Sequence, residues 1–300
     1  MGLDNLLRGR IEKPPRTLLY GVEGIGKSTF AAEAPEPIFL GAEDGTHHLD
    51  IVRFPQPERW DDVREALRLL THEKHDRKTF VIDTLDWMEP LVWADLCARA
   101  QKASIEDFGY GKGYVAALDE WRKFLAAVER LWNTTGMEIV FLAHAAVKQF
   151  RNPEGDDFDR YQLKIHGSAA GLVKEWCDAV LFANWQTFAS KDERTKRVKG
   201  VSTGARMVYT TRTAAYDAKN RYDLPEELPL DWNEYRNAVR NPVGRDTLAA
   251  ECLRKGGEVG GDVAAQTAAY VEAHRGDASA LARLNNRLNA LLAKASQEAK

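Results

Sequence analysis

The sequence predicts an α/β fold in which helices cover the faces of a mostly parallel sheet. Short apolar runs of strand type alternate with helical segments along the first two thirds of the chain, as parallel strands joined by crossovers require. A glycine-rich loop at residues 21–28 stands between one such run and a helix opening. With 300 residues, 44% of them hydrophobic, the chain is long enough to bury a core of this kind.

The individual elements follow from apolar runs and their spacing. We expect strands at residues 16–20, 36–41, 79–83, 137–143, 178–185, 205–213 and 214–220. Residues 60–70 and 113–132 repeat apolar side chains at helical spacing, and a further helix opens directly after the loop, at residues 29–34, and is closed by Pro35. After the proline-rich stretch 224–229 the composition changes. We therefore expect an α/β domain at 1–235 and a small helical appendage at 236–300, with helices over 245–256 and 262–298.

Composition and charge exclude some classes of protein. Three widely spaced cysteines, Cys97, Cys177 and Cys252, indicate neither a disulfide framework nor a zinc site. No apolar run approaches the ~20 residues that span a bilayer, and the chain starts without a signal-peptide core, so we expect a cytoplasmic protein with no membrane partner. The net charge of −3 conceals nine basic and three acidic side chains in residues 191–221. That stretch suits a polyanionic partner or a solvated hairpin tip.

Residues 21–28 read G-V-E-G-I-G-K-S, a complete G-x-x-x-x-G-K-S phosphate-binding loop. Its glycines let backbone N–H groups curl around phosphates, Lys27 reaches the terminal phosphates, and Ser28 supplies a hydroxyl to magnesium. The residues expected to bind the triphosphate are Gly21, Glu23, Gly24, Ile25, Gly26, Lys27, Ser28 and Thr29. The sequence therefore predicts ATP and Mg²⁺ as ligands.

Two strand ends supply carboxylates for this site. The run 79–83 ends in Asp83, which we expect to hold the magnesium shell together with Ser28, with Asp86 as the local alternative. The run that follows the loop helix delivers Glu43 to the same edge of the sheet. A carboxylate there can orient and deprotonate the water that attacks a γ-phosphate.

The order of these motifs resembles that of the RecA-type recombinase ATPases. After the loop come a strand ending in Ala-Glu-Asp-Gly-Thr-His-His-Leu-Asp, a strand ending in Ile-Asp-Thr, the strand 139–144, and a late strand with Asp-Ala-Lys-Asn-Arg. More narrowly, residues 15–230 are similar to phage-encoded, RecA-like Sak-type ATPases implicated in single-strand annealing and recombination. The resemblance implies a RecA-like core, ATP hydrolysis, and Glu43 as the catalytic base.

The same resemblance implies roles for three more side chains. The sensor at the end of the fourth motif strand is usually glutamine in that family, whereas this chain has His144, which can also hydrogen-bond a γ-phosphate. Lys219 and Arg221 lie two apart on a strand, so they point to the same side. In the family such a pair reaches the nucleotide of the neighbouring subunit, which implies a homo-oligomer, either a ring or a filament. The alternative is two exposed basic residues before a proline turn.

Single-stranded DNA is the partner that the resemblance implies, with a single-strand DNA-binding protein as a further one. Residues 147–163 follow the sensor strand where the family has a mobile loop, and they mix cations with aromatic rings. The candidate DNA-binding residues are Lys148, Phe150, Arg151, Phe158, Arg160 and Tyr161. Residues 108–114 are a second candidate loop. An ordinary surface loop is the alternative for each.

The motifs predict a magnesium-dependent ATPase, and the resemblance implies that it assembles on single-stranded DNA in phage-type recombination or annealing. A helicase-type or packaging-type motor of the same fold would share every ATPase residue. A small-molecule or nucleotide kinase would need an acceptor pocket and an arginine-rich lid, which the acidic segment 152–159 does not resemble. A non-hydrolysing nucleotide-gated module would not need Glu43 and Asp83.

Overall fold

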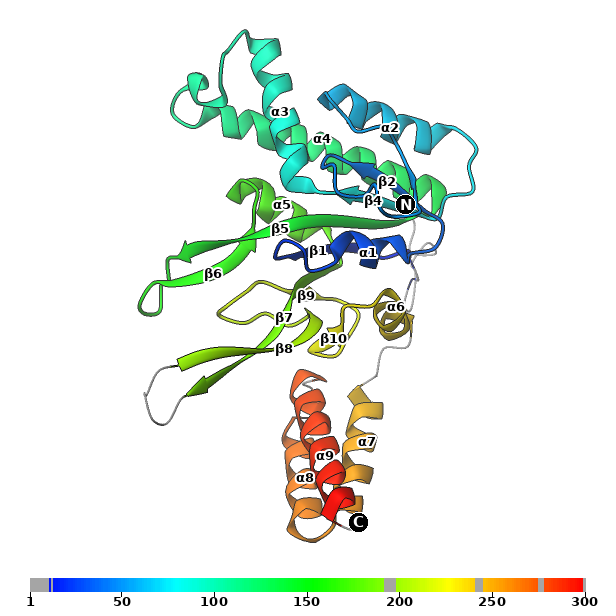
Figure 1. Ribbon diagram of the computed structural model, residues 1–300, viewed down its shortest axis with the longest axis vertical. Coiled ribbons are helices and arrows are strands. Elements are labelled where there is room, and N and C mark those ends of the chain that lie inside the picture. Colours follow the sequence, from blue (N-terminus) through cyan, green and yellow to red (C-terminus); the bar gives the residue numbers. More distant parts are fainter. Residues whose placement is uncertain (1–10, 12, 192–197, 241–244, 275–277, 299–300) are drawn as a thin grey trace, which may run out of the picture.

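The computed structural model describes residues 11, 13–191, 198–240, 245–274 and 278–298 (Figure 1). The described strands are β1 (Arg16–Gly21), β2 (Pro37–Gly41), β3 (Val52–Arg53), β4 (Thr79–Asp83), β5 (Glu138–Phe150), β6 (Phe158–Leu163), β7 (Ala179–Lys191), β8 (Val198–Tyr209), β9 (Lys219–Asn220) and β10 (Glu227–Pro229). The described helices are α1 (Lys27–Ala32), α2 (Trp60–His72), α3 (Leu85–Ala100), the 3₁₀ helix η2 (Ile105–Phe108), α4 (Lys112–Thr135), α5 (Gly167–Trp176), α6 (Trp232–Arg240), α7 (Arg245–Val259), α8 (Gly261–Ala273) and α9 (Ala278–Glu298).

The sheet has the order β10-β8-β7-β1-β5-β4-β2-β3. The strands from β7 to β3 are parallel, whereas β8 and β10 are antiparallel additions at one side. Strand β5 lies between β1 and β4, and Gly21 at the end of β1 is in register with His144. Because parallel strands end at the same edge, the loop after β1 and the polar residues after β2 and β4 meet there.

Two apolar layers explain why the central strands are apolar along their whole length. Successive side chains of a strand point to opposite faces, so Leu18 packs under α2, α3, α4 and α5, whereas Leu19 packs with α1 and α6 on the other face. Both residues are fully buried. The predicted fold class is confirmed in its architecture: an α/β core with a mostly parallel sheet, followed by C-terminal helices.

Some expected elements have different bounds in the structure. Strands β5 and β7 continue well beyond residues 143 and 185, and the strand expected at 214–220 is only the two-residue β9. Helices α3 and α5 had no clear periodic signal in the sequence. Helix α3 contains Pro90, and apolar side chains such as the exposed Trp87 lie outside its buried face, so it has little amphipathic contrast to detect.

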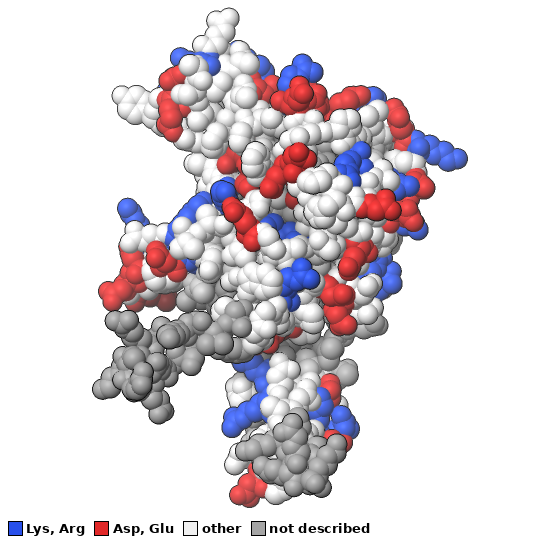
Figure 2. Space-filling view, viewed as in Figure 1, with Lys and Arg blue, Asp and Glu red and all other residues white. Residues whose placement is uncertain are grey.

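The segment expected to be a loop at 147–163 is largely a β-hairpin. Strands β5 and β6 pair antiparallel from Ala145↔Leu163 to Phe150↔Phe158. The rings of Phe150 and Phe158 are in contact, with centroids 5.2 Å apart. Cross-strand aromatic contacts of this kind stabilise antiparallel pairs, so the proline and glycine of this segment occupy only the turn. Exposed acidic side chains gather at the tip of this hairpin (Figure 2).

The C-terminal helices form their own small core. Helices α7, α8 and α9 pack around Leu248, Cys252, Val271, Leu281 and Leu288, and they stand together at one end of the molecule (Figure 1). An ion pair of 2.7 Å joins Arg283 to Glu226 of the α/β part. The proposed boundary at 235/236 lies inside α6, whose Trp232 packs on the sheet, and it stays a prediction. Among the described residues, no helix has the length and apolar character needed to cross a membrane.

Candidate active site

The phosphate-binding loop takes a conformation that only glycine allows at several positions. Gly24 and Gly26 have φ angles of 71° and 106°, in the left-handed region where a side chain is strained. At Gly21, an added Cβ would lie 2.3 Å from the carbonyl oxygen of Ala183. Glycine therefore lets β1 and β7 approach closely at the point where the loop begins. Helix α1 starts at Lys27, so it includes the last two residues of the loop.

Lys27 is buried beneath the loop. Its side chain is 6% exposed, and its Nζ donates to the backbone carbonyls of Val22 at 3.1 Å and Gly21 at 3.4 Å. Burial lowers the pKa of Lys27, and the nearby carboxylates of Asp83, Asp86 and Glu43 oppose that effect. The ammonium group is thus held by the loop and surrounded by negative charge.

Ser28 and Asp83 form the pair expected to hold magnesium. The hydroxyl of Ser28 donates to Asp83 Oδ2 at 2.6 Å, and Asp83 is only 4% exposed. Burial raises the pKa of Asp83, although the hydrogen bond from Ser28 opposes the shift. A hydroxyl and a carboxylate that meet in a cavity are the hard oxygen ligands that Mg²⁺ prefers. The residues therefore fit the ion, and a bound cation would compensate the buried negative charge.

His144 lies between two carboxylates. Its Nδ1 is 2.9 Å from Asp86 Oδ2, and its backbone N–H donates to Asp86 Oδ1 at 2.8 Å. On the other side, Nε2 is 3.9 Å from Glu43 Oε2. Burial acts to raise the pKa of Asp86, but the hydrogen bonds from His144 outweigh it and hold the pKa below the usual value. Because an ionised carboxylate only accepts hydrogen bonds, Nδ1 carries the proton and Nε2 faces Glu43.

A cavity of about 310 Å³ collects these groups at the carboxyl edge of the sheet. It is lined by Gly24, Gly26, Lys27, Ser28, Thr29, Glu43, Gly45, His48, Asp83, Thr84, His144 and Arg206. Most of the residues predicted to bind the triphosphate and magnesium are thus brought together, with Glu43 and His144. Of the others, Ile25 is fully buried in the core and Glu23 is exposed. Asp86 is the alternative magnesium ligand that the sequence offers, but in the structure its carboxylate is hydrogen-bonded to His144.

Arg206 is one of four cavity residues that the predicted site does not include, with Gly45, His48 and Thr84. It belongs to β8, far along the chain, and its Nη1 is 3.4 Å from the carbonyl oxygen of Ile25 in the loop. The antiparallel register that opposes Arg206 to Trp185 places it there. No motif around residue 206 encodes that register, so the only available signal was a basic side chain within a strand-like run.

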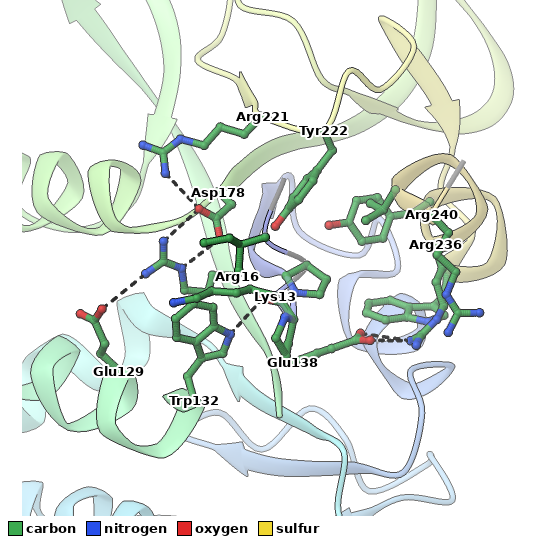
Figure 3. Close-up of a pocket in the computed structure, with 16 residues that line it drawn as sticks. Lys13, Arg16, Glu129, Trp132, Glu138, Asp178, Arg221, Tyr222, Arg236 and Arg240 are labelled. Atoms are coloured by element: carbon green, nitrogen blue, oxygen red, sulfur yellow. Dashed lines mark hydrogen bonds and ion pairs between the residues drawn. The ribbon is translucent and has the colours of Figure 1, made fainter. Parts of the chain in front are cut away.

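Lys219 and Arg221 lie at the opposite edge of the sheet. Strand β9 pairs with the first residues of β7, and Lys219 Nζ donates to three carbonyls at the end of α5, those of Lys174, Glu175 and Cys177. Arg221 forms an ion pair of 3.0 Å with Asp178 (Figure 3). The structure therefore does not bring this pair to the loop of its own chain.

Arg221 borders a larger cavity of about 730 Å³ at that edge (Figure 3). Its charged side chains largely engage one another: Arg16 binds Asp178 through two hydrogen bonds of 2.9 Å, and Arg236 binds Glu138 at 2.9 Å. Lys13 lies over the ring of Trp132 at 4.6 Å. These contacts join the amino ends of β1, β5 and β7 to α4 and α6.

Two of the candidate DNA-binding cations are occupied within the chain. Arg160 is 4% exposed, and its guanidinium donates to Asp217 Oδ1 at 2.7 Å and to the carbonyls of Thr213 and Tyr216. Lys148 Nζ donates to the carbonyls of Leu163 and Ile165. Both residues therefore stabilise the base of the hairpin.

The remaining candidates lie nearer the surface. Phe150 and Phe158 are half-buried and contact each other across the hairpin, whereas Tyr161 packs against Phe182 with ring centroids 5.0 Å apart. Arg151 is exposed beside the hairpin turn. In the second candidate segment, Tyr110 is fully exposed. Of the basic stretch at 191–221, residues 192–197 lie outside the described residues.

Comparison with known proteins identifies a family. A family model described as "AAA domain" matches residues 13–222, more than half of the chain. Comparison with curated proteins finds no match. Among solved structures, a chain described as the RadB recombinase is similar at 12% identity with a TM-score of 0.37, covering 65% of this chain and 79% of that one. The family match spans the loop and every other residue that lines the cavity, and the chain therefore belongs to the AAA domain family of P-loop ATPases.

Proposed function

We propose that this ATPase depends on DNA: it binds single-stranded DNA, forms a homo-oligomer, and serves phage-type recombination or strand annealing. The observation that carries the proposal is the course of β5. The strand carries His144 at the cavity and then continues without a break into the hairpin with β6. A ligand on the hairpin and a nucleotide in the cavity would thus contact the same strand.

The proposed hydrolysis uses groups that already lie together. Lys27 and the loop N–H groups bind the phosphates of ATP, while Ser28 and Asp83 hold magnesium, which supplies charge neutralisation when bound. Glu43 accepts a proton from the attacking water. His144, held by Asp86, presents Nε2 to Glu43 and the cavity.

The hairpin offers two aromatic rings and an exposed arginine for sequence-independent binding of single-stranded DNA. Phe150 and Phe158 are partly accessible and Arg151 is exposed. Stacking of a base on an aromatic ring contributes about 1–3 kcal/mol, and phosphate contacts contribute a separate part that depends on salt. The acidic tip directs such binding to the flanks of the hairpin rather than to its end.

The test measures ATP hydrolysis with and without single-stranded DNA, and DNA binding in the presence of an ATP analogue over a range of salt concentrations. We expect DNA to stimulate turnover. Phe150→Ala and Phe158→Ala should each weaken DNA binding by about 5-fold or more without changing the slope of affinity against salt.

Arg122→Ala, on the exposed face of α4, is the control and should leave DNA binding unchanged. Absence of binding at low salt, with turnover intact, would contradict the DNA-dependent function and favour a kinase. Processive strand separation would instead identify a helicase-type motor.

A further inference from the structure

Arg206 is held in place from both sides of its strand. Its neighbours in β8 pair with β7, and its own carbonyl accepts a hydrogen bond of 2.9 Å from the N–H of Leu230. From this fixed backbone the side chain reaches the phosphate-binding loop, where Nη1 donates to the carbonyl of Ile25. The guanidinium also lies against Gly26, because a Cβ added there would be 2.7 Å from Nη1.

The charge of Arg206 is not neutralised by a neighbour. Within the described part of the chain, no carboxylate forms an ion pair with it, although it lines a cavity that contains Glu43 and Asp83. The other cation of the cavity is the buried Lys27. A triphosphate with bound magnesium still carries net negative charge, and Glu43 and Asp83 add two more negative charges to the cavity. The single positive charge of Lys27 does not balance this total.

The residues expected to contact a neighbour's nucleotide are differently placed. Lys219 and Arg221 already bind groups of their own chain at the far edge of the sheet. Arg206 is the arginine that lines the cavity in the same chain. Its fork of N–H donors matches the geometry of phosphate oxygens better than a lysine does.

We propose that Arg206 is a catalytic residue that acts within its own chain, binding the terminal phosphates of the triphosphate held by the loop and stabilising the charge that develops on the γ-phosphate. The inference rests on the proposed hydrolysis of ATP at this cavity. It deepens that function, because it gives each subunit a second phosphate-binding cation of its own beside Lys27.

The test compares binding of fluorescent ATP and ADP analogues to wild type and Arg206→Ala, at dilutions where sedimentation shows a monomer. A charged hydrogen bond to phosphate predicts that Arg206→Ala weakens ATP-analogue binding by about 10- to 100-fold and ADP-analogue binding much less. The affinity of Arg206→Lys for the ATP analogue should lie between that of wild type and that of Arg206→Ala. Turnover of Arg206→Ala should be reduced at every protein concentration.

Arg212→Ala is the matched control, since Arg212 is exposed and pairs with Asp217 rather than with the loop. Lys27→Ala should lose both analogues. If wild type binds neither analogue, the proposed function fails. If wild type binds both and Arg206→Ala keeps the wild-type preference for ATP, with unchanged thermal unfolding, Arg206 does not act on the terminal phosphates and the inference is wrong.

Discussion

The two carboxylates beside His144 differ in what they can do. The side chain of Asp86 is only 4% exposed and makes two hydrogen bonds with His144, whereas Glu43 is partly exposed to the cavity and lies 3.9 Å from Nε2. Asp86 therefore fixes the ring, and Glu43 remains available to water. In the proposed hydrolysis, this division would thus make Asp86 a positioning residue and Glu43 the group that meets the attacking water.

Asp86→Asn tests this division. The amide keeps the size of the side chain and one acceptor, but it can also donate, so Nδ1–H is no longer enforced. We expect kcat to fall by at least about 10-fold, because Asp86 orients His144 beside Glu43, and proton transfer by a positioned side chain contributes about 10²–10⁴ to turnover. Binding of an ATP analogue should change by less than about 2-fold. Nitrogen NMR of His144 should show loss of the Nδ1–H form.

The control for Asp86→Asn is Asp95→Asn, which removes a carboxylate from the same helix where it pairs with Arg64 and Arg99. That variant should keep both kcat and the ring state of His144. A wild-type ring state in Asp86→Asn, or equal losses in the two variants, would contradict a positioning role for Asp86.

At the scale of elements, Glu89 links α3 to the start of α5. Both of its oxygens accept from the backbone N–H of His166 at 3.0 Å, and the side chain is 5% exposed. Burial raises the pKa of Glu89 to about 7, although the hydrogen bond from His166 and the charge of Lys148 oppose the shift. The folded protein therefore holds this proton over a pH range in which an unfolded chain has released it.

This shift predicts how stability depends on pH. Between about pH 4.5 and 7 the native state binds more protons at Glu89 than the unfolded state, so the free energy of unfolding falls as pH rises. A shift of this size corresponds to about 3 kcal/mol. In Glu89→Gln, which keeps an acceptor for His166, urea unfolding should lack this decrease.

Glu65→Gln on α2 serves as a control. Hydrogen bonds from Arg68 lower the pKa of Glu65, so this carboxylate changes the free energy of unfolding with pH in the opposite direction to Glu89. If wild type and Glu89→Gln show the same dependence on pH, Glu89 does not hold its proton in the folded state.

The sequence predicted the parts of the site that are carried by contiguous residues at strand ends. The loop, Glu43, Asp83 and His144 could be placed because parallel strands end at one edge. Arg206 could not, because its position depends on an antiparallel register set by contacts far away in the chain. The inward orientation of Arg160 is likewise decided by Asp217, a partner 57 residues away.

At the scale of the whole molecule, the two edges of the sheet carry different chemistry. The cavity with the loop lies at the carboxyl edge, whereas Lys219 and Arg221 lie at the amino edge. A neighbouring subunit related by translation along the strands would present its amino edge to this cavity. Such a heterologous contact produces an open filament, or a ring if the contact also includes a rotation that closes.

Mixing two inactive variants tests whether Arg221 acts on a neighbour. Glu43→Gln should keep ATP binding and lose most turnover, and Arg221→Ala should keep binding by a single subunit. In a mixed assembly, some interfaces pair an intact Glu43 with an intact Arg221, so turnover should return in proportion to their abundance. A co-assembled mixture that stays inactive would show that Arg221 has no such role.

The unbroken course of β5 has a consequence for variation in this protein. Residues two apart on a strand share a face, so His144, Ala146, Lys148 and Phe150 form one series along β5. A one-residue insertion or deletion between the cavity and the hairpin would turn Lys148 and Phe150 to the opposite face while His144 stayed in place. Changes in the length of this strand therefore keep Lys148 and Phe150 on the face of His144 only when they involve two residues at a time.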